Sequence, residues 1–171
     1  MAVLRICKYP EESLQTTSKN IKAWSDDLTS LVGDMLETMY GVNGIGLAAN
    51  QVGLPIKMAV IDAKPSGKSK RIVLINPKII EEKGHITESE GCLSLPGIFC
   101  QVKRSEMIRI LSYDENGVPF EIKAKGLLAR ALQHEIDHLE GKLIIDRLGP
   151  WDKIKVKREI KEYQKIWAPC A

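Results

Sequence analysis

Apolar side chains recur at helical spacing between residues 28 and 39. They follow the i, i+3, i+4, i+7 pattern of one helix face and are Leu28, Leu31, Val32, Met35, Leu36 and Met39. Ser25, a favourable N-cap residue, precedes them, and Gly41, typical of a helix end, follows them. The pattern therefore predicts an amphipathic helix in the first quarter of the chain.

Short β-branched segments replace this pattern after residue 54 and read as strands. They cover 56–62, 71–76 and 78–82, with a loop at 64–70 between the first two. Residues 98–124 continue in the same style, and the sequence Asp-Glu-Asn-Gly at 114–117 predicts a hairpin turn within them. These segments favour a mostly antiparallel sheet.

Two further helices are expected after the strands. The first runs over about 127–140 and ends at Gly141, and the second begins near Trp151, after a Gly-Pro pair. Helix, antiparallel sheet and helices together predict the α+β class, with the sheet around the helix at 127–140. We expect residues 1–148 to form one body and residues 149–171 a helix that belongs to the same domain.

The composition is that of an ordinary globular chain: 171 residues, 44% hydrophobic and 27% charged. No apolar run approaches the ~20 residues that a membrane helix needs, so no membrane association is expected. Four scattered cysteines fit a reducing cytoplasm. Residues 147–171 hold seven basic against three acidic side chains, which indicates either an anionic partner or a solvated helix face.

The expected helix at 127–140 contains the sequence His-Glu-x-x-His, formed by His134, Glu135 and His138. Histidines at i and i+4 lie on one helix face and can bind one metal ion, while the adjacent glutamate handles protons. Leu127 and Ala131 share that stripe, which predicts an apolar-walled space around the histidines. The alternative is a polar helix face with two hydrogen-bonded histidines.

A catalytic metal usually has three protein ligands and an open position, so a third ligand is needed. Downstream of His138 no histidine remains, and the acidic residues form no third-ligand motif. Cys92 is the best upstream candidate because a thiolate binds such metals well. The alternative for Cys92 is a small buried apolar residue.

The segment 44–53, with the sequence GIGLAANQVG, is the third unusual stretch. Gly44 and Gly46 permit close backbone approach, and Gln51 is an amide in apolar surroundings. No Lys-Ser/Thr follows the glycines, which disfavours a phosphate-binding loop. A packed turn with a hydrogen-bonded Gln51 remains an alternative.

The segments GIGLAANQVG, EGCLSLPG and QHEIDHLEG occur in this order and resemble the three signature motifs of the peptide deformylase family. The resemblance covers nearly the whole chain. It implies that Cys92, His134 and His138 bind one divalent metal ion. That ion is typically Fe(II), replaceable by Ni(II), Co(II) or Zn(II), and residues 1–148 become the catalytic body.

The resemblance also implies roles for further residues. Glu135 would be the general acid and base, and Gln51 with the backbone N–H of Leu93 would stabilise the developing oxyanion. The substrate-binding residues would be Ile45, Gly46, Gly91, Leu127 and Ala131, the last two taken from the helical wheel.

Two charged pairs have open interpretations. Glu90 and Arg104 form either a supporting ion pair near Cys92 or a solvated strand pair. Asp137 and Arg130 either orient the metal ligands or are ordinary helix-surface charges.

The implied reaction removes the N-formyl group from the formyl-methionine of nascent polypeptides in the cytoplasm and releases formate. The ribosome is a candidate partner of the basic C-terminal helix, without sequence-specific nucleic-acid binding. The competing functions are an HExxH metallopeptidase and a non-catalytic ribosome-binding relative.

Overall fold

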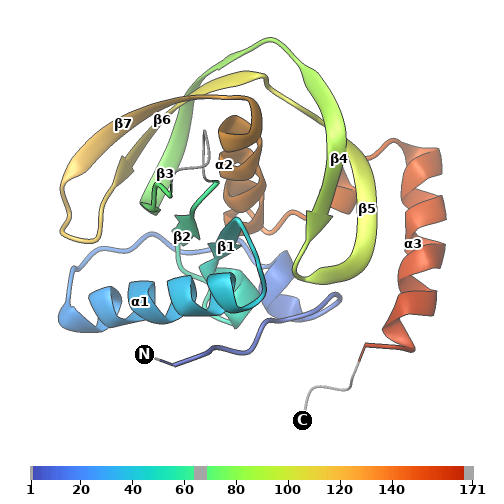
Figure 1. Cartoon of the computed structure of the whole chain (residues 1–171), viewed down its shortest axis with the longest axis horizontal. Coiled ribbons are helices and arrows are strands. Elements are labelled where there is room, and N and C mark those ends of the chain that lie inside the picture. Colours follow the sequence, from blue (N-terminus) through green and yellow to red (C-terminus); the bar gives the residue numbers. More distant parts are fainter. Residues whose placement is uncertain (1, 64–68, 168–171) are drawn as a thin grey trace.

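The computed structural model describes residues 2–63 and 69–167 (Figure 1). The helices are α1 (Asp26–Gly41), α2 (Gly126–Leu139) and α3 (Pro150–Gln164), with short 3-10 turns η1 (Glu12–Gln15), η2 (Ala49–Val52) and η4 (Ile144–Arg147). The strands are β1 (Gly46–Ala48), β2 (Met58–Ile61), β3 (Ile72–Lys83), β4 (Ile86–Cys92), β5 (Leu95–Arg104), β6 (Met107–Tyr113) and β7 (Pro119–Lys125). The predicted α+β class is confirmed.

The strands form a five-stranded sheet of order β1-β2-β3-β6-β7 and a separate β4–β5 hairpin. Every named strand pair is antiparallel. In Figure 1 the long strands curve over α2, and the β4–β5 hairpin descends on the other side of this helix. The predicted loop at 64–70 falls largely on residues 64–68, which lie outside the described residues.

The two strands expected at 71–76 and 78–82 are one strand, β3, and that part of the prediction is wrong. Pro77 has no backbone N–H to donate to a neighbouring strand. The strand can nevertheless continue through it, because the register shifts between Ile75 and Lys78 and no hydrogen bond from Pro77 is required. Asn76 takes a left-handed conformation there (φ 51°). Its side-chain amide holds the backbone of Ile21 with bonds of 2.9 and 2.8 Å.

The predicted N-terminal helix is confirmed as α1. The Ser25 side chain accepts a hydrogen bond from the backbone N–H of Leu28 and so caps its first turn. Its apolar face, including Val32, Met35 and Met39, packs with β1 and β2 in a buried cluster. The helix therefore supports the sheet edge from which β1 leads into η2.

The apolar face of α2 packs against the sheet. Leu132 and Leu139 are fully buried among sheet residues such as Leu74 and Ile110, as the helical wheel predicts. This contact leaves the stripe with His134 and His138 facing the β4–β5 hairpin.

The C-terminal helix α3 lies beside β5 (Figure 1). Val156 and Ile160 are buried with Leu95 and Ile98 in a third apolar cluster, whereas the charged residues between them are exposed. The predicted amphipathic character of this helix is confirmed. Among the described residues, no helix is long and apolar enough to cross a membrane.

Candidate active site

Three side chains that are far apart in sequence converge between α2 and the end of β4. His138 Nε2 lies 3.2 Å from Cys92 Sγ and 3.2 Å from His134 Nε2. All three donor atoms lie within 4.8 Å of one another. His138 is only 1% exposed, so the histidines do not belong to a solvated helix face.

The three donors fit a divalent metal ion. Ligands bonded at about 2.0–2.3 Å in a tetrahedron are separated by about 3.3–3.7 Å, close to the two measured separations. One thiolate and two imidazoles are a set that borderline-soft ions prefer. The structure thus brings Cys92, and not a carboxylate downstream of His138, to the histidine pair.

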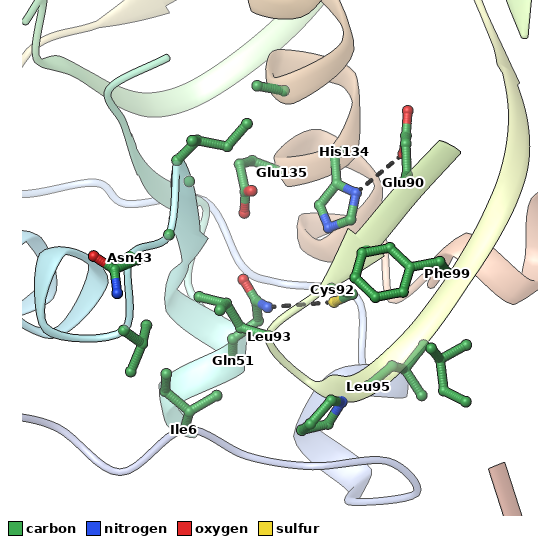
Figure 2. A pocket seen from close by; sticks show the side chains of 18 of the residues that line it. Ile6, Asn43, Gln51, Glu90, Cys92, Leu93, Leu95, Phe99, His134 and Glu135 are labelled. Carbon is green, nitrogen blue, oxygen red and sulfur yellow. Dashed lines mark hydrogen bonds and ion pairs between the residues drawn. The ribbon is translucent and has the colours of Figure 1, made fainter. Parts of the chain in front are cut away.

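Glu135 lies beside this group and is buried, at 4% exposure (Figure 2). Burial raises the pKa of its carboxyl to about 7. Its Oε2 atom has no hydrogen-bond partner among the described residues. A Cβ at Gly46 would overlap the Glu135 carboxylate, so the glycine in β1 makes this close approach feasible. An unpartnered buried carboxylate oxygen is suited to exchanging a proton with a bound molecule.

Gln51 is held in one orientation by its neighbours. Its Oε1 accepts a hydrogen bond from the backbone N–H of Ala48 at 2.9 Å. Its Nε2 therefore points toward Ser94 Oγ, at 3.1 Å. The same atom lies 3.7 Å from Cys92 Sγ (Figure 2). The amide is thus hydrogen-bonded within the turn and also faces the metal-ligand group.

A buried charge network contacts the candidate metal-binding group at His134. Arg104, 3% exposed, donates from Nε and one terminal nitrogen to Glu90, at 3.1 and 2.9 Å, and from the other nitrogen to Asp137. Arg147 also binds Asp137, with its Nε at 2.9 Å. Glu90 Oε2 in turn lies 3.3 Å from His134 Nδ1.

The network settles the two open interpretations of these charged residues. Glu90 and Arg104 are a buried pair and not a solvated strand pair, and Asp137 is buried as well. Burial raises the pKa of Glu90, but hydrogen bonds from His134 and Arg104 outweigh it and lower this pKa to about 2. Arg130 joins from the other side, with its Nε 3.6 Å from Glu90 Oε1.

A pocket of about 980 Å³ opens in front of the ligands. Every residue that the sequence predicts as substrate-binding lines it, namely Ile45, Gly46, Gly91, Leu127 and Ala131. Cys92, His134, Glu135, Gln51 and Leu93 line it as well. His138, which is 1% exposed, is not among the lining residues. A large apolar side chain, Phe99, is 69% exposed at the rim (Figure 2).

Three residues that hold neighbours of the site in place are not predicted from the sequence. Arg147 binds Asp137, Ser94 accepts from Gln51, and Asn50 donates from its side chain to the backbone oxygen of His138. Asn50 and Ser94 stand inside the recognised motifs, so their position was a usable signal. Arg147 has none, because nothing local marks its partner ten residues away.

An HExxH helix with a convergent cysteine, a buried carboxylate and a deep apolar pocket defines a candidate metal-dependent hydrolase. The polypeptide deformylase family model matches residues 3–154, and the chain belongs to this family.

Individual relatives agree with the family match. The peptide deformylase of Thermodesulfovibrio yellowstonii is 48% identical over 162 residues, which are 94% of this chain and 98% of that protein. The Elusimicrobium minutum enzyme is 45% identical over 98% of this chain and 100% of its own length. The crystal structure of the Legionella pneumophila peptide deformylase superposes with a TM-score of 0.91 at 38% identity, covering 99% of this chain and 100% of that one.

Replacing Arg104 by Met is expected to lower the free energy of unfolding by about 3–5 kcal/mol, because two buried carboxylates each lose a fully buried guanidinium partner. Arg71→Met removes a half-exposed arginine paired with Glu115 and should cost less than about 1 kcal/mol. Urea denaturation of the two variants measures both values. Equal losses would show that the buried network contributes no more than a surface ion pair.

Proposed function

We propose that this protein hydrolyses the N-formyl group of formyl-methionine at the start of nascent polypeptides. One water is consumed: its oxygen bonds to the formyl carbon, the C–N bond breaks, and formate and a free amino terminus result. The cytoplasm, where such chains are made, is the proposed location. The observation that carries the proposal is the convergence of Cys92, His134 and His138 beside the buried carboxylate of Glu135, whose Oε2 has no hydrogen-bond partner among the described residues.

We further propose that Cys92, His134 and His138 bind one divalent ion. Fe(II) is the native ion that we infer from the family resemblance, and the same donors are suited to Ni(II), Co(II) or Zn(II). A divalent ion supplies a Lewis acid that polarises the formyl oxygen and acidifies an attacking water.

Glu135 moves the proton in this proposal. It takes a proton from the attacking water and delivers it to the leaving nitrogen, as a carboxyl with a pKa of about 7 can do near neutral pH. Gln51 Nε2 and the backbone N–H of Leu93 donate to the oxyanion that develops on the formyl oxygen. Because Ala48 fixes the orientation of the Gln51 amide, this donor is in place before substrate binds.

The pocket in front of Glu135 is proposed to hold the methionine side chain. Ile45, Leu127 and Ala131 supply apolar walls for a flexible thioether. The backbone at Gly46 and Gly91 is proposed to pair with the substrate as an added strand. A Cβ at Gly91 would come within 2.9 Å of the Phe99 ring, so a side chain there would crowd this edge of the groove.

Loss of the Glu135 carboxylate should abolish formate release while metal binding is retained. We expect anaerobically purified protein loaded with Fe(II) or Ni(II) to release formate from formyl-Met-Ala-Ser. Glu135→Gln should be slower by at least about 10²-fold at equal metal content, measured by a coupled formate assay.

Unformylated Met-Ala-Ser is the control that separates a deformylase from a metallopeptidase. Cleavage of its peptide bonds would favour the peptidase alternative. Metal-loaded protein that acts on neither peptide would favour a non-catalytic binding role.

Ala131→Trp is expected to raise KM for formyl-Met substrates by about 10-fold, since a lost apolar pocket contact is worth roughly 1–3 kcal/mol. The kcat should change less, because Ala131 lies on the pocket wall and not among the proposed proton-transfer groups. Steady-state kinetics at fixed metal content give both values. An unchanged KM would remove Ala131 from the methionine pocket.

We also propose that the exposed basic face of α3 binds ribosomal RNA, through phosphate contacts without sequence specificity. Lys157, Arg158 and Lys161 are exposed on this face. In this view residues 1–148 are the catalytic body, and residues 149–171 add an anchor within the same domain.

The double variant Lys157→Glu/Lys161→Glu should weaken cosedimentation with ribosomes, and added salt should weaken the wild type in the same way. Lys103→Glu/Lys123→Glu makes the same charge change on exposed residues of β5 and β7 and should bind like the wild type. If both double variants bind equally well, α3 is not the contact.

A further inference from the structure

The last turn of α3 contacts the chain segment that follows Cys92. Tyr163 lies over Gly97, where a Cβ would overlap its ring. Three residues past the end of α3, the indole N–H of Trp167 donates to the backbone oxygen of Pro96 at 3.1 Å. These two aromatic side chains therefore hold the start of β5, four and five residues after the cysteine.

A second path leads from α3 to the same segment. The side-chain amide of Gln164 donates to the backbone oxygen of Tyr9 at 3.1 Å. The backbone N–H of Tyr9 donates to the oxygen of Ser94 at 3.0 Å. Since the Ser94 hydroxyl accepts from Gln51 Nε2, this path ends at the side chain proposed to stabilise the oxyanion.

The inner face of α3 closes the space beneath the segment. Val156 and Ile160 are buried against Leu95 and Ile98, and Cys92 packs against the same cluster. The chain turns at Leu93 and Ser94, and Gly97 in the following strand takes a left-handed conformation with φ 81°. Three contacts hold the segment after Cys92: its β4–β5 pairing, its hydrogen bond with Tyr9, and its packing against α3.

We propose that Tyr163 and Trp167 are positioning residues for Cys92 and Ser94. Neither touches the pocket, but together they fix the turn that carries a metal ligand and the partner of Gln51. A metal site requires its ligands within about 0.5 Å of the productive geometry. The inner face of α3 thus belongs to the metal site, while its outer face is basic and exposed. The inference rests on the proposed metal site.

The test uses the full chain loaded with Co(II), whose thiolate charge-transfer absorption reports the Cys92 bond. Substituting a residue that orients a metal ligand typically lowers metal affinity roughly 10–100-fold. Trp167 acts one contact further from the metal. We therefore expect the Trp167→Ala variant to lose Co(II) to excess EDTA about 5-fold faster than the wild type. Trp167→Phe keeps a ring but loses the N–H and should fall in between. Trp151→Ala, which removes a tryptophan that is 84% exposed at the start of α3, should match the wild type.

The rates are compared well below the melting temperature of each variant, so that global unfolding does not contribute. If Trp167→Ala does not fold, Tyr163→Leu and Trp167→Phe carry the same comparison. If the Trp167 and Tyr163 variants lose Co(II) at the same rate as Trp151→Ala, these side chains do not position the metal ligand, and the proposal is overturned. A wild-type protein that shows no thiolate absorption with Co(II) would instead overturn the proposed metal site, and the positioning role with it.

Discussion

A guanidinium buried between two carboxylates ties the β4–β5 hairpin to α2. Arg104 comes from β5, Glu90 from β4 and Asp137 from α2, so the three charges can be satisfied only when these elements are docked in one way. Burying any of them alone would be strongly unfavourable. Because Cys92 lies two residues after Glu90, the docking also sets the distance from the cysteine to the histidines on α2.

The same docking explains how one helix can serve three purposes. The apolar face of α2 packs on the sheet, and its residues Arg130 and Asp137 lie in the charge network. What remains is the stripe with His134, His138 and Ala131, of which His134 and Ala131 line the apolar pocket. The burial of Glu135 is a consequence of this position of α2. Burial raises the pKa of the Glu135 carboxyl into the range useful for proton transfer.

Local sequence pattern predicts those features that depend on neighbours along the chain. The caps and periodicity of α1 and α2, the HExxH spacing and the resemblance of three motifs all lie within short segments. The continuous strand β3 was missed because Pro77 reads as a strand end unless the bulge is known. β4 was missed because most of its side chains are exposed, and so it lacks an apolar alternation. The buried contacts of Arg147 and Glu90 are made with residues of other secondary-structure elements, and no local sequence pattern marks those partners.

The central claim is that one thiolate and two imidazoles meet at a single metal ion. X-ray absorption spectroscopy of the nickel-loaded protein tests it most directly, with Cys92→Ser as the matched control. We predict one sulfur ligand at about 2.3 Å and two imidazole nitrogens at about 2.0–2.1 Å, with the sulfur absent from the control. A metal shell without sulfur in the wild type would contradict the account.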